Sequence, residues 1–201
     1  MRAEKKRALR AAALSQRGSL SEVEVLSRSH LIQGRALHFP RYLSSSAVAL
    51  YCPIQNEIAT DQILNHALIK SKKVFYPRTG SPSGLELIQI DSVADLQAGR
   101  FGIPEPTGNR RLSDADAQDL IVFVPGVGFD LRGNRLGRGY GGYDRLLAGI
   151  GPKAAAVGLA YEFQLVDEMP AEEWDQKVHF IITEDRVIDC GGESLQPRRM
   201  A

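Results

Sequence analysis

Residues 137–144 read GRGYGGYD, in which four glycines stand among an arginine, two tyrosines and a final aspartate. Glycine loses more conformational freedom on folding than any other residue, so this density weakens a regular helix or strand. It is useful where backbone N–H groups must approach phosphate oxygens, because a Cβ atom would hold the ligand away. Arg135, Arg138 and Arg145 lie within eleven residues and supply positive charge. The stretch therefore predicts a phosphate-binding loop.

Two other interpretations of this loop stay open. Gly137, Gly139 and Gly142 satisfy the pattern GxGxxG, and Glu162 follows twenty residues later, where a dinucleotide-binding fold places its ribose carboxylate. That fingerprint requires its first glycine directly after a strand, whereas the nearest expected strand ends near Pro125. A flexible surface hairpin without a ligand would explain the glycines, but it leaves the neighbouring arginines unexplained.

The longer segment 124–147, VPGVGFDLRGNRLGRGYGGYDRLL, resembles the nucleotide-binding signature of the 5-formyltetrahydrofolate cyclo-ligases, also called methenyltetrahydrofolate synthetases. Four further blocks agree with that family in order and spacing: KRALR (6–10), NEIAT (56–60), FGIPEP (101–106) and WDQKVHFIITE (174–184). The resemblance covers the chain from Lys6 to about Ile188 and is more specific than any single glycine motif.

The resemblance implies an ATP-dependent and Mg²⁺-dependent enzyme that converts 5-formyltetrahydrofolate, with or without a polyglutamate tail, to 5,10-methenyltetrahydrofolate and releases ADP and phosphate. In that chemistry the γ-phosphoryl group activates the formyl oxygen, and N10 of the folate then attacks. The alternative is a non-catalytic relative that binds folate or nucleotide. Two departures support it: Gly142 stands where relatives carry the first of two tyrosines, and His179 stands where relatives often have aspartate.

The resemblance assigns the ATP phosphates to Lys6 and Arg10, which are four residues apart and share one face of an expected helix. Taken alone, the pair would favour a solvated basic face, and the glycine-rich loop is what favours phosphate binding instead. The remaining nucleotide-binding positions that the resemblance implies are Arg135, Leu136, Gly137, Arg138, Gly139, Tyr140, Gly141, Gly142 and Tyr143.

The resemblance also implies a folate-binding carboxylate at Glu57, and places the stretch from Arg138 to Gly142 against both substrates. The implied substrate-binding residues are Glu57, Arg138, Gly139, Tyr140, Gly141 and Gly142. Arg138 and Tyr143 are the expected catalytic residues, with Tyr140 able to replace the ring missing at Gly142.

Asp144 is expected to hold Mg²⁺, since one carboxylate together with nucleotide oxygens suits this hard cation. Asp144 would also interact favourably with the dipole of a helix that begins at this point. We do not carry a metal-binding role to His179, because Mg²⁺ prefers oxygen ligands, and we expect a strand residue there.

The elements that must position these residues alternate along the chain. Helical periodicity predicts helices over 3–16, 23–37 and 61–73, with a capping box at Ser21 and Glu24 and a cap at Thr60. Apolar runs predict strands at 47–52, 74–77, 85–90, 120–125, 154–162 and 179–184. This alternation predicts an α/β fold, a single doubly wound domain over 1–190 with a mostly parallel sheet flanked by helices. We expect 99–113 to be an irregular connection and 191–201 to be a disordered tail.

The composition of the chain limits the kinds of partner that it is expected to bind. A net charge of +1 over 201 residues indicates neither a nucleic acid nor a membrane as partner. Cys52 and Cys190 lie far apart and predict free thiols in a cytoplasmic protein, which we expect to be a monomer. The basic start imitates a mitochondrial presequence, although Glu4 and the lack of serine enrichment disfavour that interpretation. The remaining histidines have no partners nearby in sequence and are expected to be structural: His30, His38 and His66.

Overall fold

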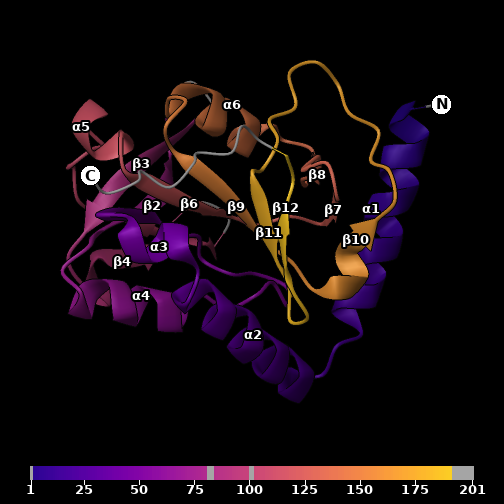
Figure 1. Ribbon diagram of the computed structural model, residues 1–201, viewed down its shortest axis with the longest axis horizontal. Helices are drawn as coiled ribbons and strands as arrows, with labels where there is room; N and C mark the ends of the chain where they lie inside the picture. The colour runs from indigo at the N-terminus through magenta and orange to yellow at the C-terminus, as the bar shows by residue number, and fades with distance from the viewer. Residues whose placement is uncertain (1, 81–83, 100–101, 192–201) are drawn as a thin grey trace, which may run out of the picture.

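The computed structural model describes residues 2–80, 84–99 and 102–191, and its centre is one seven-stranded sheet with helices on both faces (Figure 1). The strand order is β12-β11-β9-β6-β1-β2-β3. The strands of this sheet are β1 (Ala47–Ala49), β2 (Lys73–Thr79), β3 (Leu85–Ile90), β6 (Leu120–Val124), β9 (Ala155–Leu159), β11 (Phe180–Ile182) and β12 (Val187–Asp189).

The five central strands run parallel and the two edge strands, β3 and β12, run antiparallel to their neighbours. The expected doubly wound α/β fold with a mostly parallel sheet is therefore confirmed. After β1 the chain first adds β2 on one side and later adds β6 on the other. The strand order thus reverses between β1 and β6. Open α/β sheets bind ligands beyond the carboxyl ends of the strands at such a switch point.

The side chains of β1 show how the two layers form. Ala47 and Ala49 join one hydrophobic cluster, whereas Val48 and Leu50 join another on the opposite face. This period of two is the pleat of a strand buried on both faces. One face is covered by α2, α3 and α4, and the other is covered by α6 (Figure 1). The helices are α1 (Arg2–Gly18), α2 (Glu22–Leu37), α3 (Pro40–Ser44), α4 (Asp61–Ile69), α5 (Asp114–Ala117) and α6 (Gly142–Gly149), with 3-10 turns η1 (Val93–Asp95) and η3 (Glu162–Gln164).

The N-terminal helix α1 packs away from the main sheet, against a small sheet in the order β10-β7-β8. Its apolar residues Leu9, Ala13 and Leu14 contact a cluster that includes Val127 and Leu136. This packing holds the face of α1 that carries Lys6 and Arg10 beside the segment that follows β6. The small sheet consists of β7 (Gly128–Asp130), β8 (Arg135–Leu136) and β10 (Leu165–Val166).

Several local predictions need correction. The capping box of Ser21 and Glu24 is present, but Thr60 forms no capping hydrogen bond to α4, because its hydroxyl donates to the carbonyl of Tyr51 at 3.0 Å. The expected irregular connection 99–113 contains β5 (Pro104–Pro106), which pairs antiparallel with β4 (Leu96–Ala98). Of the expected disordered tail, only Gly191 lies within the described residues.

Candidate active site

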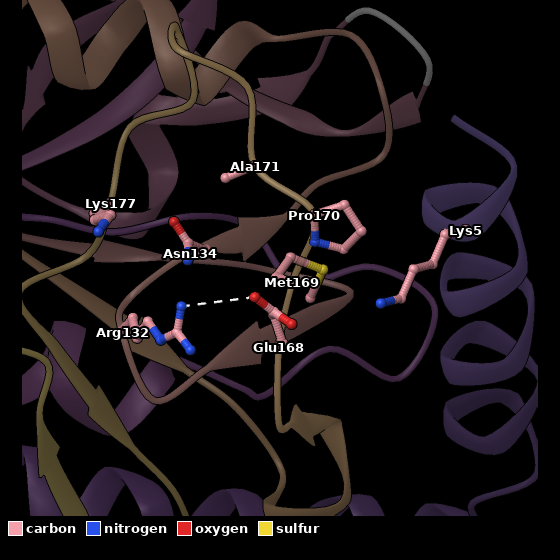
Figure 2. Close-up of a pocket in the computed structure, with 8 residues that line it drawn as sticks. All are labelled: Lys5, Arg132, Asn134, Glu168, Met169, Pro170, Ala171 and Lys177. Atoms are coloured by element: carbon pink, nitrogen blue, oxygen red, sulfur yellow. Dashed lines mark ion pairs between the residues drawn. The ribbon is translucent and has the colours of Figure 1, made fainter. Parts of the chain in front are cut away.

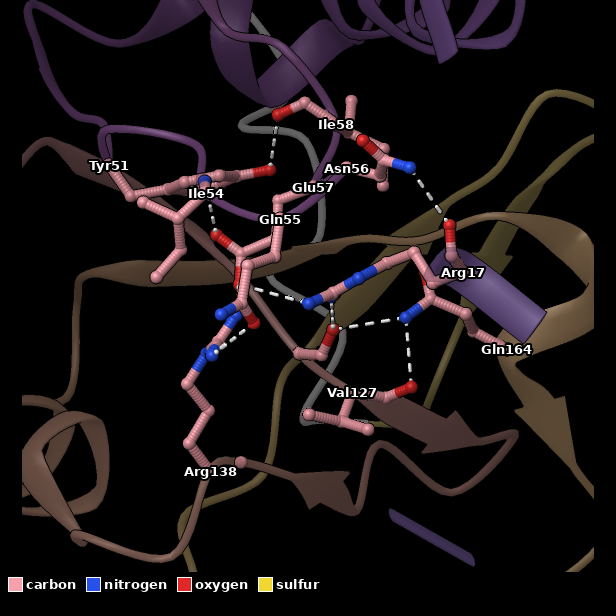
Figure 3. A network of polar contacts seen from close by, with 12 residues as sticks. Arg17, Tyr51, Ile54, Gln55, Asn56, Glu57, Ile58, Val127, Arg138 and Gln164 are labelled. Atoms are coloured by element: carbon pink, nitrogen blue, oxygen red, sulfur yellow. Dashed lines mark hydrogen bonds and ion pairs between the residues drawn. The ribbon is translucent and has the colours of Figure 1, made fainter. Parts of the chain in front are cut away.

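Three chain segments meet beyond the carboxyl ends of β1, β6 and β9, at the switch point of the sheet (Figure 3). Glu57 follows β1, Gly126 and Val127 follow β6, and Gln164 follows β9. The side-chain amide of Gln164 is 1 % exposed and donates to the carbonyls of Gly126 at 3.0 Å and Val127 at 2.8 Å. The floor of this region is therefore a buried, hydrogen-bonded junction between neighbouring strands.

Glu57 is held in a defined orientation at this junction and is only 8 % exposed. Its Oε2 accepts a hydrogen bond from the backbone N–H of Ile54 at 3.1 Å. Its Oε1 lies 3.2 Å from Nη2 of Arg138 and 3.6 Å from Nη2 of Arg17 (Figure 3). The carboxylate thus stands between two arginines that lie far apart in the sequence.

The loop that carries Glu57 is tied to the end of α1. Gln55 and Asn56 both have positive φ angles, 49° and 59°, a conformation that costs energy for residues other than glycine. The amide of Asn56 donates to the carbonyls of Arg17 and Leu20, each at 3.1 Å, which offsets that cost. Glu57 and the C-terminal turn of α1 are therefore positioned together.

Arg17 is a residue that the sequence analysis missed. Its side chain is 1 % exposed, and its Nη1 donates to the carbonyl of Gly126 at 3.2 Å. Its Nε and Nη2 have no hydrogen-bond partner among the residues that the structure describes. Burial lowers the pKa of this guanidinium, and the nearby Glu57 acts in the opposite direction. The available signal was spacing, because Arg17 lies seven residues after Arg10 and continues the helical stripe of Lys6 and Arg10.

The glycine loop connects β8 to the start of α6. Gly139 and Gly141 have φ angles of +102° and +65°, so two of the glycines occupy conformations that other residues rarely adopt. Gly141 is the N-cap of α6, and within the described chain no side chain caps that helix. The first N–H groups of α6 are therefore available to an anion, which supports the prediction of a phosphate-binding loop.

Helix α1 presents its cations to this loop. Nε of Arg10 donates to the carbonyl of Gly137 at 2.9 Å, and Nζ of Lys6 lies 2.7 Å from the carboxylate of Asp175. The two residues share one face of α1, as predicted. Arg10 meets the glycine loop directly, whereas Lys6 meets the segment between β10 and β11.

The residues that flank the loop form a compact ionic cluster. Nη2 of the buried Arg135 lies 3.0 Å from Oδ1 of Asp144, and that oxygen also accepts from the backbone N–H of Gln176 at 3.2 Å. The guanidinium of Arg135 lies over the ring of Tyr143, with 5.5 Å between Cζ and the ring centroid. Burial raises the pKa of the Tyr143 phenol, so this group can donate a hydrogen bond but is not a base near neutral pH.

Other residues that are predicted to bind the nucleotide differ in how far their side chains are exposed to solvent. The side chain of Leu136 packs into the cluster under α1 and is 2 % exposed, so only its backbone can face a ligand. Tyr140 is 83 % exposed, and Nη2 of Arg145 donates to its carbonyl at 3.0 Å. The structure thus brings Glu57, Arg138 and Arg10 to the glycine loop, and the side chain of Tyr140 is exposed to solvent.

Comparisons with known proteins decide between the interpretations left open above. The sequence model of the 5-formyltetrahydrofolate cyclo-ligase family matches residues 2–184. The chain belongs to this family. A mouse 5-formyltetrahydrofolate cyclo-ligase is 30% identical over 190 residues, which cover 90% of this chain and 94% of the relative. The corresponding enzyme of Haemophilus influenzae is 30% identical over 182 residues, covering 87% and 95%.

Solved structures agree with this assignment. The NMR structure of Aquifex aeolicus 5,10-methenyltetrahydrofolate synthetase matches with a TM-score of 0.81 and 36% identity, covering 96% of this chain and 97% of that one. A Mycoplasma pneumoniae 5,10-methenyltetrahydrofolate synthetase matches with a TM-score of 0.71 and 27% identity, covering 89% and 98%. The resemblance predicted from five sequence blocks is therefore confirmed.

The dinucleotide interpretation does not fit this cyclo-ligase fold. A strand, β8, does precede Gly137, contrary to our expectation, because the polar segment after Pro125 folds into the β7–β8 hairpin. That strand is antiparallel to β7 and lies outside the main sheet, so it is not the first strand of a βαβ unit. Glu162 accepts from Thr183 and Arg186, each at 2.6 Å, and is already engaged elsewhere.

One carboxylate beside the glycine loop, that of Asp144, could share a Mg²⁺ ion with nucleotide oxygens. Within the described ranges, no group of three or more histidine, cysteine, aspartate or glutamate side chains could hold a metal. Asp144 offers one carboxylate in the first turn of α6, and Mg²⁺ is commonly bound by one or two carboxylates plus substrate phosphates. Nδ1 of His179 accepts from the backbone N–H of Ala156 at 2.9 Å, and His179 is half-buried in the bend directly before β11, not within a strand as expected.

The other singled-out side chains have local partners. The ring nitrogens of His30, His38 and His66 contact Gln62, Gly34 and Tyr42, respectively, which agrees with structural roles for these three histidines.

Cys52 and Cys190 are free thiols, and burial raises their pKa to about 11 and about 12, respectively. Of the helices that the structure describes, none is long and apolar enough to cross a membrane.

The structure contains a cavity of about 520 Å³ (Figure 2). It opens between α1, the β7–β8 turn and the segment that follows β10. Lys5 and Asn134 line it and are the chain neighbours of Lys6 and Arg135. Its other lining residues are Arg132, Glu168, Met169, Pro170, Ala171 and Lys177. Sequence reasoning did not indicate this cavity, because its walls come from three separate segments.

Proposed function

We propose that this chain catalyses the ATP-dependent cyclisation of 5-formyltetrahydrofolate to 5,10-methenyltetrahydrofolate, with release of ADP and phosphate. The observation that carries the proposal is the contact between Arg138 and Glu57 at the switch point of the sheet. It joins the loop expected to bind nucleotide to the carboxylate expected to bind folate. The curated relatives carry the name of the enzyme, which supports this reading over a non-catalytic one.

The nucleotide phosphates would bind between α1 and the glycine loop. The uncapped first turn of α6 offers backbone N–H groups, and Arg10 lies against the loop at Gly137. Lys6 lies one turn earlier on the same face of α1. A site of amides and cations stabilises a transferring phosphoryl group by electrostatics and positioning, and it needs no protein nucleophile.

The folate would bind with its pterin N–H groups on Glu57, which accepts hydrogen bonds and is already oriented by Ile54. The formyl oxygen attacks the γ-phosphorus, and the bond to the leaving ADP oxygen breaks. N10 then attacks the activated formyl carbon, loses its proton, and phosphate departs with the former formyl oxygen. Arg138, which contacts Glu57, would neutralise charge on the transferred group, and Tyr143 would support the adjacent Arg135.

Asp144 is the residue that would hold Mg²⁺ with the nucleotide. A bound Mg²⁺ would neutralise charge on the phosphate oxygens during transfer. In the ligand-free arrangement Arg135 is the counter-ion of Asp144. A monomeric state, a cytoplasmic location and the use of polyglutamylated folates remain predictions from the sequence.

The test is formation of methenyltetrahydrofolate absorbance from 5-formyltetrahydrofolate by the purified chain. We expect the signal with ATP and Mg²⁺ and none when ATP is omitted. The variant Glu57→Gln keeps the size of the side chain and removes its charge, so it should weaken folate binding and leave nucleotide binding intact. Folate binding without any turnover at high enzyme concentration would favour the non-catalytic alternative.

A further inference from the structure

The buried guanidinium of Arg17 lowers the stability of the fold unless other groups compensate it. A guanidinium that is 1 % exposed has lost nearly all of its hydration, and two of its nitrogens have no hydrogen-bond partner among the described residues. Buried donors without partners are destabilising, and buried charges persist where a nearby opposite charge compensates them. The compensating group here is Glu57, whose Oε1 lies 3.6 Å from Nη2 of Arg17.

Glu57 has two arginine neighbours that differ in their freedom to move. Arg17 is fixed in the last turn of α1 by its bond to the carbonyl of Gly126. Arg138 comes from the glycine loop, its side chain is 30 % exposed, and its second nitrogen bonds the exposed side chain of Gln55 at 2.8 Å. The side chain of Arg138 is therefore free to move away from the carboxylate, whereas that of Arg17 is not.

The proposed function requires Arg138 to face the phosphates during the reaction. When Arg138 moves, a carboxylate that is 8 % exposed would lose its nearest cation. An unpaired buried charge is strongly destabilising. Arg17 remains beside Oε1 and provides the lasting counter-charge.

We propose, on the basis of the proposed function, that Arg17 is a positioning residue that holds the Glu57 carboxylate ready for the pterin while Arg138 moves to the nucleotide. Arg17 is too deeply buried to contact the folate itself, and it acts through Glu57. Its role should therefore appear in folate recognition and not in nucleotide recognition.

The test compares Arg17→Met, Arg17→Gln and Arg17→Lys with the wild type, measuring KM for each substrate, kcat and thermal unfolding. We expect the two neutral variants to raise the KM for folate about tenfold or more, and to change the KM for ATP by less than about twofold. Arg17→Lys keeps the charge and should recover most of the folate affinity. Gln164 still donates to the carbonyl of Gly126 in every variant, so that acceptor keeps a partner. If Arg17→Met does not fold, Arg17→Gln takes its place, since its amide can replace the bond to Gly126.

A matched control and a double-mutant cycle separate this role from a merely structural one. Arg7→Met makes the same substitution at an exposed position of α1 and should change neither KM. In a Glu57→Gln background, Arg17→Gln should add little to the loss of folate affinity, because the two residues act as a unit. Equal effects on both substrates, or an undiminished effect in that background, would overturn the inference. A wild type that neither binds folate in direct titration nor forms product would instead refute the proposed function.

Discussion

Nη2 of Arg138 lies 3.2 Å from Oε1 of Glu57, so the glycine loop contacts the carboxylate after β1. A phosphate group that takes this guanidinium in a bidentate contact would compete with Glu57 for it. Under the proposed function, nucleotide binding would draw Arg138 away and leave Oε1 free to accept from the pterin. Under that proposal the contact would couple the binding of the two substrates.

The first prediction follows from this coupling. A non-hydrolysable ATP analogue should tighten the binding of 5-formyltetrahydrofolate to the wild type, measured by titration calorimetry. In Arg138→Met, folate should bind with the same affinity whether or not the analogue is present, because the competing contact with Glu57 is gone. Retention of the full nucleotide effect in this variant would show that Arg138 does not carry the coupling.

The second prediction concerns the cations of α1. Arg10→Ala should raise the KM for ATP about tenfold or more, since hydrogen bonds to charged groups are worth roughly 1.5–3 kcal/mol. The KM for folate should change by less than about twofold. Lys6→Ala should act in the same direction but more weakly, because Lys6 is already paired with Asp175. Arg7→Ala, on an exposed face of α1, is the matched control. An equal rise in the KM for ATP in this variant would mean that all three residues act only through the general positive charge of α1.

The third prediction tests the metal contact. Asp144→Asn keeps the size of the side chain but removes the charge that suits Mg²⁺. Turnover at saturating ATP should fall, and the Mg²⁺ concentration that gives half-maximal activity should rise roughly tenfold if the carboxylate is a ligand. A thermal unfolding curve for the same variant reports the loss of the Arg135 ion pair separately. An unchanged Mg²⁺ dependence would assign Asp144 to that ion pair alone.

The sequence predicted the parts of this site that depend on local pattern. The stripe of Lys6 and Arg10 is visible as helical spacing, and the glycine loop is visible as composition. Arg17 escaped prediction because its burial depends on how α1 docks on a small sheet whose strands are two or three residues long. Such short strands leave no periodic signal, so the sequence predicts no strand between Pro125 and the glycine loop. The contact of Arg138 with Glu57 joins residues 81 positions apart and required the strand order.

The fourth prediction concerns stability and pH. Burial, with a smaller contribution from Arg41, lowers the pKa of His179 below its ordinary value of 6.5, and its Nδ1 accepts from Ala156, which requires a neutral ring. The unfolded chain therefore binds a proton that the folded chain does not. The contribution of His179 to stability is complete above pH 6.5 and is lost as the pH falls from there toward its lowered folded pKa. Urea unfolding at pH 7 and pH 5.5 should show this loss, and His179→Gln should reduce it. An identical pH slope in that variant would contradict the assignment.

The last prediction asks whether the glycine loop binds phosphate or only turns the chain. Gly139 has a φ of +102°, so any side chain there is strained even though the nearest side-chain atom to an added Cβ, Nη2 of Arg10, is 3.8 Å away. Loss of stability alone is therefore uninformative. Gly151 provides the matched control, with a φ of +87° and nothing within 4 Å of an added Cβ. Gly139→Ala and Gly151→Ala should each cost about 1 kcal/mol of folding free energy from backbone strain.

Only Gly139→Ala should weaken nucleotide binding, because its methyl group would stand where the backbone approaches the phosphates beside Arg10. Titration with ATP and thermal unfolding of both variants separate the two effects. Equal ATP affinity in the two variants, with equal losses of stability, would mean that Gly139 serves the turn into α6 and that the phosphates bind elsewhere. Reduced affinity confined to Gly139→Ala would tie the missing Cβ atom to the ligand, because the backbone strain is matched.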